Sequence, residues 1–182
     1  EPNGELGQWY LHIFDTSQPD FNWKNDQVKS FHHDNLRYWL NQGVDGFRFD
    51  AVGHLVENGP TAWESQPENH RIMGQVQALL NSYDKRFMVC EAPAAPQAFA
   101  ATASCGRAFA FDLKDHILRA VRGDSAAIAS LNQYFLTAPP VMATFLANHD
   151  SFAGERVWNQ LSGNLAQYKL AAASYLLLPG TP

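Results

Sequence analysis

The stretch "GVDGFRFDAVGHL" at residues 43–55 alternates charged side chains with aromatic ones. Successive side chains of a β-strand point to opposite faces, so Arg48 and Asp50 share one face. Phe47 and Phe49 then share the other face. The pattern predicts a two-faced strand, with its aromatic side chains against surrounding helices and its charges toward an interior or its mouth.

Two further apolar runs end in a carboxylate, as this strand does. "FMVCE" (87–91) ends in Glu91, and "FLANHD" (145–150) ends in Asp150. The interval from Asp50 to Glu91 fits one strand-plus-helix unit, and the longer interval to Asp150 fits two. In a parallel barrel the C-terminal strand ends form the catalytic face, so we expect the three acids to converge on one pocket.

Helical and strand-like patterns alternate along the chain. Apolar residues recur at helical spacing from Val28 to Trp39, between Asn25 as a helix N-cap and Gly43 as a stop. Such alternation implies parallel strands in an α/β fold. The other expected elements are a helix that buries Ile72, Val76, Leu79, Leu80 and Tyr83, strands at 86–91, 107–112, 141–150 and 174–180, and helices beginning near Asp115 and Leu165.

The composition is that of a globular chain. Its 182 residues are 46% hydrophobic, the net charge is -5, and no run of five like charges occurs. This argues against a nucleic-acid or polybasic membrane partner, and no apolar stretch approaches the ~20 residues that span a bilayer. Without repeats or linkers, residues 1–182 are expected to be part of a single domain. The first residues do not read as a signal peptide, and localisation stays open.

The cysteines and two of the histidines give no sign of a metal centre or a disulfide framework. Cys90 and Cys105 are too few for such a framework, and Cys90 lies in an apolar run, so we expect it to be a small buried thiol. His32 and His33 have no partner at metal-ligand spacing, and we expect both to be exposed to solvent. No metal site and no required cofactor are predicted.

Converging carboxylates with a neighbouring arginine suit glycoside hydrolysis. Arg48 and Asp50 alone could form a buried ion pair, and a single strand-end acid is often a helix cap or loop anchor. Three acids in one context, with Arg48 and His149 beside two of them, favour catalysis instead. An arginine favours an ionised neighbour and an apolar setting favours a protonated one. Asp50 therefore fits the attacking acid and Glu91 the proton donor.

Three segments carry a family resemblance. "DGFRFDAVGH" (45–54), "VCEAP" (89–93) and "FLANHD" (145–150) resemble, in order, signature segments of glycoside hydrolase family 13, the α-amylase family. "LLLPGTP" (176–182) resembles the family's eighth barrel strand. The resemblance implies a partial (β/α)8 TIM barrel, from about the fourth to the start of the eighth strand. The family's first signature segment would lie upstream, and such a half barrel is not expected to act alone.

The resemblance also implies a role for each site residue. Asp50 would be the nucleophile, Glu91 the general acid/base and Asp150 the stabiliser of the transition state. Arg48 would orient Asp50 and keep it ionised, and His149 would hydrogen-bond the sugar. The family retains anomeric configuration, which implies reacting carboxyl groups about 5–5.5 Å apart.

Finer features point toward one branch of the family. "QPDFNW" (18–23) resembles the "QPDLNW" segment of the oligo-1,6-glucosidase and α-glucosidase branch. Ala51 is the small residue that this branch associates with α-1,4 preference; plain packing on the aromatic face of the strand is the alternative. His54 is either a loop hydrogen-bonder or a substrate contact. Gly53 replaces the lysine of many true α-amylases, so a structural calcium ion is possible but not supported.

The sequence therefore predicts a retaining glycoside hydrolase that cleaves α-1,4-glucosidic bonds in malto-oligosaccharides or starch fragments. Its expected partner is an α-glucan or oligosaccharide substrate. An α-glucosyl transferase or isomerase of the trehalose- or isomaltulose-forming type is the main competing hypothesis, because it shares these residues. An inactive amylase-like binding subunit or a metal-dependent barrel hydrolase would also be compatible with a barrel of this kind.

Overall fold

Parallel pairing between consecutive segments organises the chain. The computed structural model describes residues 9–182. Strand β1 (Gly46–Phe49) pairs in parallel with β2 (Phe87–Cys90), with Arg48 opposite Val89. Gly46 lets the two strands approach closely, because a Cβ atom there would overlap the carbonyl oxygen of Phe87.

Beyond β2, the parallel pairing of successive segments continues as isolated bridges. Each segment pairs with the next one along the chain, and helices lie between them. This arrangement is typical of the wall of a parallel barrel rather than of a doubly wound sheet. The bridges are Cys90 to Ala108, Phe109 to Ala143 and Ala143 to Thr181.

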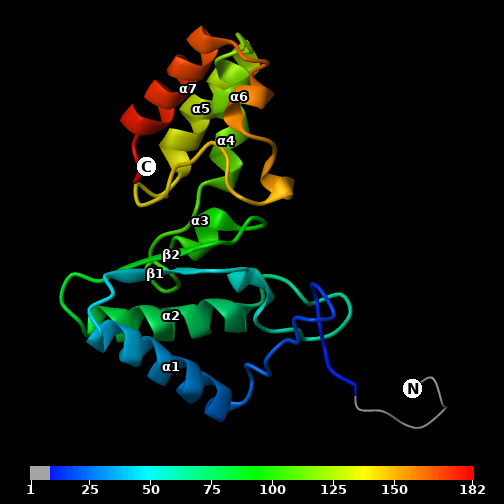
Figure 1. Ribbon diagram of the computed structural model, residues 1–182, viewed down its shortest axis with the longest axis vertical. Coiled ribbons are helices and arrows are strands. Elements are labelled where there is room, and N and C mark those ends of the chain that lie inside the picture. Colours follow the sequence, from blue (N-terminus) through cyan, green and yellow to red (C-terminus); the bar gives the residue numbers. More distant parts are fainter. Residues whose placement is uncertain (1–8) are drawn as a thin grey trace, which may run out of the picture.

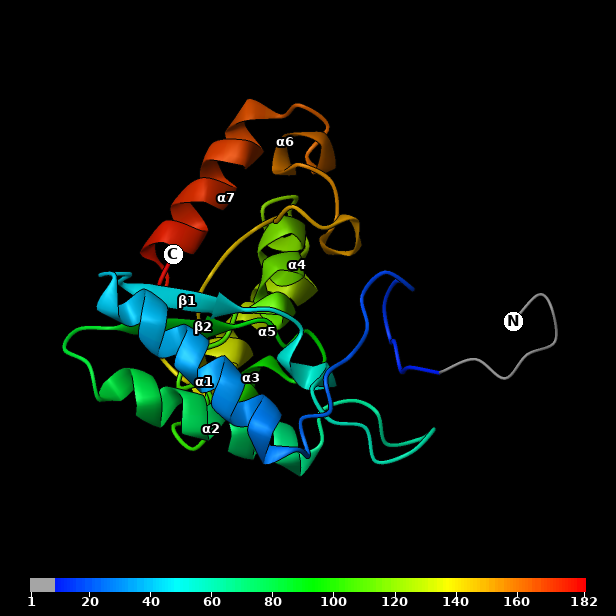
Figure 2. The same ribbon diagram turned by 60° about the horizontal axis from the view of Figure 1, so that its bottom comes forward.

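Figure 1 shows how the helices lie relative to this pairing. Helices α1 and α2 lie on one face of β1 and β2, and Figure 2 shows the same layer after rotation. Helix α4 packs against α5 and α7 at the other end of the molecule. The helices are α1 (Asp26–Asn41), α2 (Pro67–Asn81), α3 (Pro96–Phe99), α4 (Phe111–Ala120), α5 (Ser125–Thr137), α6 (Val157–Gln160) and α7 (Leu165–Leu177), with 3-10 turns η1 (Val52–His54) and η2 (Ser151–Ala153).

Both predicted ends of α1 are confirmed. The side chain of Asn25 accepts a hydrogen bond from the Gln27 amide at 2.9 Å, and Gly43 adopts a φ of 95° just after the helix. Its predicted apolar stripe is not buried: Phe31 and Trp39 are exposed, and Val28 and Leu36 are half-buried. Leu40, which is buried, lies outside the predicted stripe.

The histidines of α1 are half-buried rather than exposed, so that prediction was wrong. The ring of His32 stacks on Trp23 with centroids 4.7 Å apart, and Phe21 and Phe31 meet it edge-on. Burial lowers the pKa of His32 and of His33. Aromatic neighbours from outside the helix explain the difference, because helical spacing alone does not reveal them.

The later strands are shorter than predicted, and in the segment expected as a strand at 141–150 only Ala143 forms bridges. Helix α4 begins at Phe111, ahead of the predicted start near Asp115, and takes the end of the strand expected at 107–112. The segment 174–180 is mostly the end of α7, which begins at Leu165 as predicted. A short apolar run does not distinguish a buried strand from a helix, which explains the error.

Helix α5 was missed, although its start carries a recognisable signal. Asp124 accepts hydrogen bonds from the amides of Ala126 and Ala127, at 2.9 and 3.1 Å. An aspartate at this position is a strong N-cap, so the helix start was readable in the sequence. In the part of the chain that the structure describes, no helix is long and apolar enough to cross a membrane.

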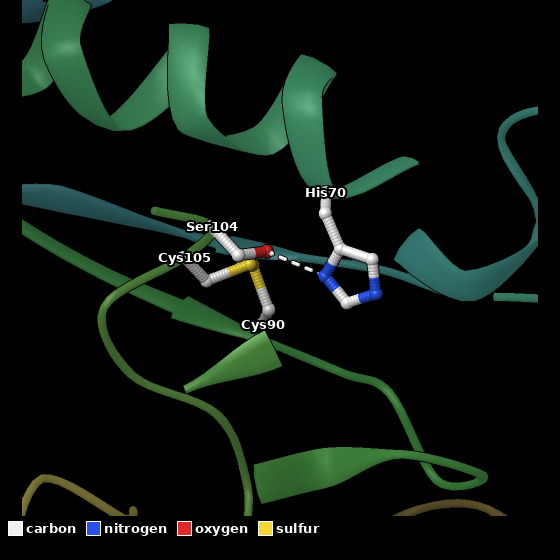
Figure 3. Close-up of a disulfide and its surroundings, with 4 residues drawn as sticks. All are labelled: His70, Cys90, Ser104 and Cys105. Atoms are coloured by element: carbon white, nitrogen blue, oxygen red, sulfur yellow. Dashed lines mark hydrogen bonds between the residues drawn. A yellow bond between two sulfur atoms is a disulfide. The ribbon is translucent and has the colours of Figure 1, made fainter. Parts of the chain in front are cut away.

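Cys90 is not a thiol but half of a disulfide, which corrects the prediction from the sequence. Cys90 and Cys105 are bonded, and both are almost completely buried. The bond lies beside a 3.1 Å hydrogen bond between His70 and Ser104 (Figure 3). It ties the last residue of β2, directly before Glu91, to the loop that follows α3.

Loss of this disulfide is expected to destabilise the full-length protein. The bond closes a loop with a sequence separation of 15. A loop of this size corresponds to about 3 kcal/mol of unfolding free energy in the chain-entropy account. Denaturant unfolding of Cys105→Ser should show a loss of this order, and a reductant should lower the stability of the wild type but not of the variant. Equal stability of both proteins under oxidising conditions would contradict the expectation.

Candidate active site

The parallel register places Asp50 and Glu91 side by side at the ends of β1 and β2. The Glu91 amide donates a hydrogen bond to the carbonyl oxygen of Phe49 at 2.8 Å. The Glu91 carbonyl oxygen in turn accepts from the amide of Val52 at 3.1 Å. The backbone on both sides of Glu91 is therefore fixed against the strand that carries Asp50.

Arg48 joins the two carboxyl groups. Its guanidinium lies 2.8 Å from Asp50 Oδ1 and also donates to Glu91 Oε2. The sequence predicted an arginine beside Asp50 but not its contact with Glu91. A planar guanidinium offers several donors in fixed directions, which suits it to hold two carboxyl groups at once.

Glu91 has a strongly perturbed acidity. Its side chain is 6% exposed, and this burial raises its pKa to about 7. The neighbouring carboxyl group of Asp50 and the negative charge of Asp150 act in the same direction, whereas Arg48 opposes the shift. A large share of Glu91 is therefore protonated near neutral pH, and the site offers a carboxylic acid beside a second carboxyl group.

The separation of about 5–5.5 Å between the two carboxyl groups, expected for a retaining glycosidase, stays a prediction. Arg48 contacts both groups and keeps them close to one guanidinium.

All three predicted acids line one pocket of about 470 Å³. Asp50, Glu91 and Asp150 share it with Ala51 and His54. Ala51 has a left-handed conformation, with a φ of 44°, because the strand ends at the residue before Asp50. Strict strand alternation therefore fails at Ala51, and the residue lies in the pocket wall.

The other predicted site residues lie around a smaller pocket of about 170 Å³. Arg48, Glu91 and His149 line it together with Phe109 and Phe145. Glu91 belongs to both pockets. The structure thus gathers Arg48 and His149 around the same carboxyl group that borders the larger pocket.

Asp150 and His149 are held by local contacts. His149 Nε2 lies 3.4 Å from Asp150 Oδ2. The Asp150 amide donates to the side chain of Asn148 at 2.9 Å, which forms a tight turn. This turn directs Asp150 to the larger pocket and leaves His149 mostly exposed, with 74% of its side chain accessible.

His54 contacts protein groups and also lines the larger pocket. Its Nε2 atom lies 3.6 Å from Glu64 Oε1, and its ring stacks on Trp63 with centroids 5.4 Å apart. Phe14 meets the same ring edge-on. The sequence did not single out Phe14, Trp63 or Glu64, because they lie in loops whose positions no periodic pattern predicts.

Metal ligands do not gather in the described part of the chain. Across residues 9–182, no group of three or more histidine, cysteine, aspartate or glutamate side chains could hold a metal ion.

Comparisons with known proteins identify the family. The model of the α-amylase catalytic domain matches residues 2–182. The trehalose synthase/amylase of Mycolicibacterium smegmatis is 35% identical over 167 residues, which cover 84% of this chain and 28% of that protein. A probable oligo-1,6-glucosidase of Bacillus subtilis is 46% identical over 55 residues, or 30% of this chain and 10% of that protein.

Solved structures agree on the fold. The trehalose-6-phosphate hydrolase of Bacillus licheniformis has a TM-score of 0.75 at 23% identity, over 97% of this chain and 37% of that one. A cyclic maltosyl-maltose hydrolase of Arthrobacter globiformis has a TM-score of 0.72 at 25% identity, over 90% and 36%. The chain spans less than a third of the length of the trehalose synthases that it matches. It belongs to the α-amylase family, glycoside hydrolase family 13, whose barrel enzymes share this fold.

Proposed function

We propose that the protein hydrolyses α-1,4-glucosidic bonds in malto-oligosaccharides, with retention of configuration, through a covalent glucosyl-enzyme. The observation that carries this proposal is the pair of neighbouring carboxyl groups: Asp50 paired with Arg48, and Glu91 with its pKa raised to about 7. In this proposal the chain supplies about the fourth to the start of the eighth strand of a single catalytic barrel.

The first half of the reaction uses both carboxyl groups. The Asp50 carboxylate attacks the anomeric carbon, and the bond from that carbon to the glycosidic oxygen breaks. Glu91 gives its proton to this oxygen, so the leaving sugar departs as a neutral alcohol. The electron pair of the broken bond stays on the oxygen, and the glucosyl group is now an ester of Asp50.

The second half reverses the roles. Glu91, now ionised, takes a proton from water, and the water oxygen attacks the anomeric carbon. The ester bond breaks and Asp50 regains its carboxylate. Two successive inversions restore the original configuration.

Asp150, His149 and Arg48 serve the sugar and the nucleophile in this proposal. Asp150 accepts hydrogen bonds from sugar hydroxyl groups, and His149 donates one. Arg48 holds Asp50 in position for attack. Their placement around the two pockets that share Glu91 supports these roles.

The position of Ala51 supports the α-1,4 preference. Its small side chain lies in the pocket wall next to Asp50, where a larger residue would reduce the space for the leaving sugar. A difference of one or two methyl groups in such a pocket is worth about 1–3 kcal/mol of discrimination.

Glucosyl transfer is a second candidate, because relatives named for trehalose synthesis match most of this chain. A transferase would use the same first step and would then deliver the glucosyl group to a sugar hydroxyl instead of water. No cofactor enters either scheme.

Product analysis of the full-length protein on maltose, isomaltose, sucrose and soluble starch tests the proposal. Maltose should yield glucose with a higher kcat/KM than isomaltose, and proton NMR should detect α-glucose as the first product. Trehalose or isomaltulose as the main product would favour the transferase. The absence of turnover on every substrate would favour an inactive binding subunit.

Replacement of the proposed nucleophile should abolish turnover. Asp50→Ala removes the group that forms the covalent intermediate, and we expect kcat on maltose to fall by more than about 1,000-fold. Asp45→Ala is the matched control, because Asp45 precedes β1 and is almost fully exposed. A well-folded Asp50→Ala protein that kept more than a few per cent of wild-type kcat would disprove the assignment.

The proposed acid/base should set both the pH profile and the leaving-group dependence. Glu91 acts as a proton donor, so the kcat/KM of the wild type for maltose should fall as the pH rises through about 7. Glu91→Gln should lose this alkaline limb. It should also retain far more activity on an aryl glucoside, whose leaving group needs no proton, than on maltose. Equal losses on both substrates would indicate a structural role for Glu91.

A further inference from the structure

The larger pocket is lined by a fourth carboxylate, Glu64, which the sequence did not single out. It lies in the loop between η1 and α2. The Ser65 amide donates to the Gly53 carbonyl oxygen at 2.7 Å, and the Ala62 amide donates to Gly59 at 3.0 Å. These bonds fold the loop back over η1 and hold Glu64 at the pocket wall.

Aromatic packing fixes the partner of Glu64. The His54 ring is stacked on Trp63 at an interplanar angle of 12° and meets Phe14 at 85°. Because both rings restrain His54, its Nε2 atom stays 3.6 Å from Glu64 Oε1. The side chain of Glu64 is 35% exposed, so its carboxylate keeps accessible lone pairs toward the pocket.

The same pocket exposes two aromatic rings. Phe14 and Phe152 line it and are 53% and 61% exposed. The C–H faces of a sugar ring pack favourably on an aromatic face, and its hydroxyl groups donate to carboxylates. Glu64 with Phe14 and Phe152 therefore offers both kinds of contact that a hexose requires.

The other acids of the pocket indicate which sugar of the substrate Glu64 contacts. The acid/base must touch the oxygen of the leaving sugar, and Glu91 lines both pockets. The larger pocket also contains Asp50 and Asp150, so the bond to be cleaved lies in it. In the proposed function, Asp150 and His149 serve the sugar that stays on Asp50. Glu64, Phe14 and Phe152 line the larger pocket outside that set and remain for the sugar that departs.

We propose that Glu64 is a specificity-determining residue that binds hydroxyl groups of the sugar that leaves, and of any sugar that later accepts the glucosyl group. This assignment rests on the function proposed above and adds an acceptor site to it. In transfer, Glu91 takes the proton of a hydroxyl group on the acceptor sugar. The oxygen of that hydroxyl group bonds to the anomeric carbon, and the ester bond to Asp50 breaks. Glu64 forms no covalent bond and only orients the acceptor.

Substrates that differ in their leaving group test this role in the full-length protein. Glu64→Ala should lower kcat/KM for maltose by about ten-fold or more, the effect of losing a hydrogen bond to a charged group. Glu64→Gln should show a smaller loss, and added glucose should capture less of the glucosyl-enzyme in both variants. Hydrolysis of 4-nitrophenyl α-glucoside should stay within about two-fold of wild type, because its leaving group has no sugar hydroxyls.

Glu68→Ala is the matched control, since Glu68 lies on α2 and its carboxylate contacts Asn58 instead of the pocket. It should leave both substrates unaffected. An unchanged maltose-to-aryl ratio in Glu64→Ala, or equal losses on the two substrates, would overturn the role of Glu64 and leave that of Asp50 and Glu91 intact. A wild-type protein that turned over neither substrate would overturn the proposed function, and this assignment with it.

Discussion

One guanidinium, that of Arg48, sets the geometry of the candidate site. It contacts Asp50 and Glu91 from the second-last position of β1, across a register that pairs Arg48 with Val89. A slip of one residue in this register would turn every side chain of β1 to the opposite face. The close approach of the strands at Gly46 resists such a slip, because other residues have no space for their side chains there. The contacts of Arg48 with the two carboxyl groups therefore depend on the backbone packing of β1 against β2.

Two opposing effects act on the pKa of Glu91: the charge of Arg48 and burial. Arg48 favours ionised carboxyl groups, yet Glu91 has a raised pKa because burial outweighs the pairing. The side chain of Asp50 is 73% exposed and that of Glu91 is 6% exposed, so the cost of dehydration falls mainly on Glu91. Two carboxyl groups that share one arginine are therefore made different by their depth, which is how a pair of acids takes separate roles.

The sequence predicted what depends on local chemistry. Asn25 was recognisable as a cap because its side chain bonds a nearby amide, and the three acids were recognisable because each follows an apolar run. The Cys90–Cys105 bond was not, because it depends on how the loop after α3 returns to β2. The face that Ala51 occupies could not be read from alternation, which holds only while the backbone stays extended, and this residue is left-handed. Such failures of local rules are expected at functional sites.

The family can be recognised from the sequence more readily than the substrate, because the two depend on different parts of the fold. Asp50 and Glu91 are fixed by β1 and β2, so the site that they form can be read from short motifs at the ends of apolar runs. Glu64 and Phe14 reach the same pocket from loops, where length and sequence vary freely without disturbing the core. Under the proposed function, a carboxylate on such a loop can change the bound sugar without changing the acids that act on it. Discrimination among sugars then depends on loop residues outside these motifs.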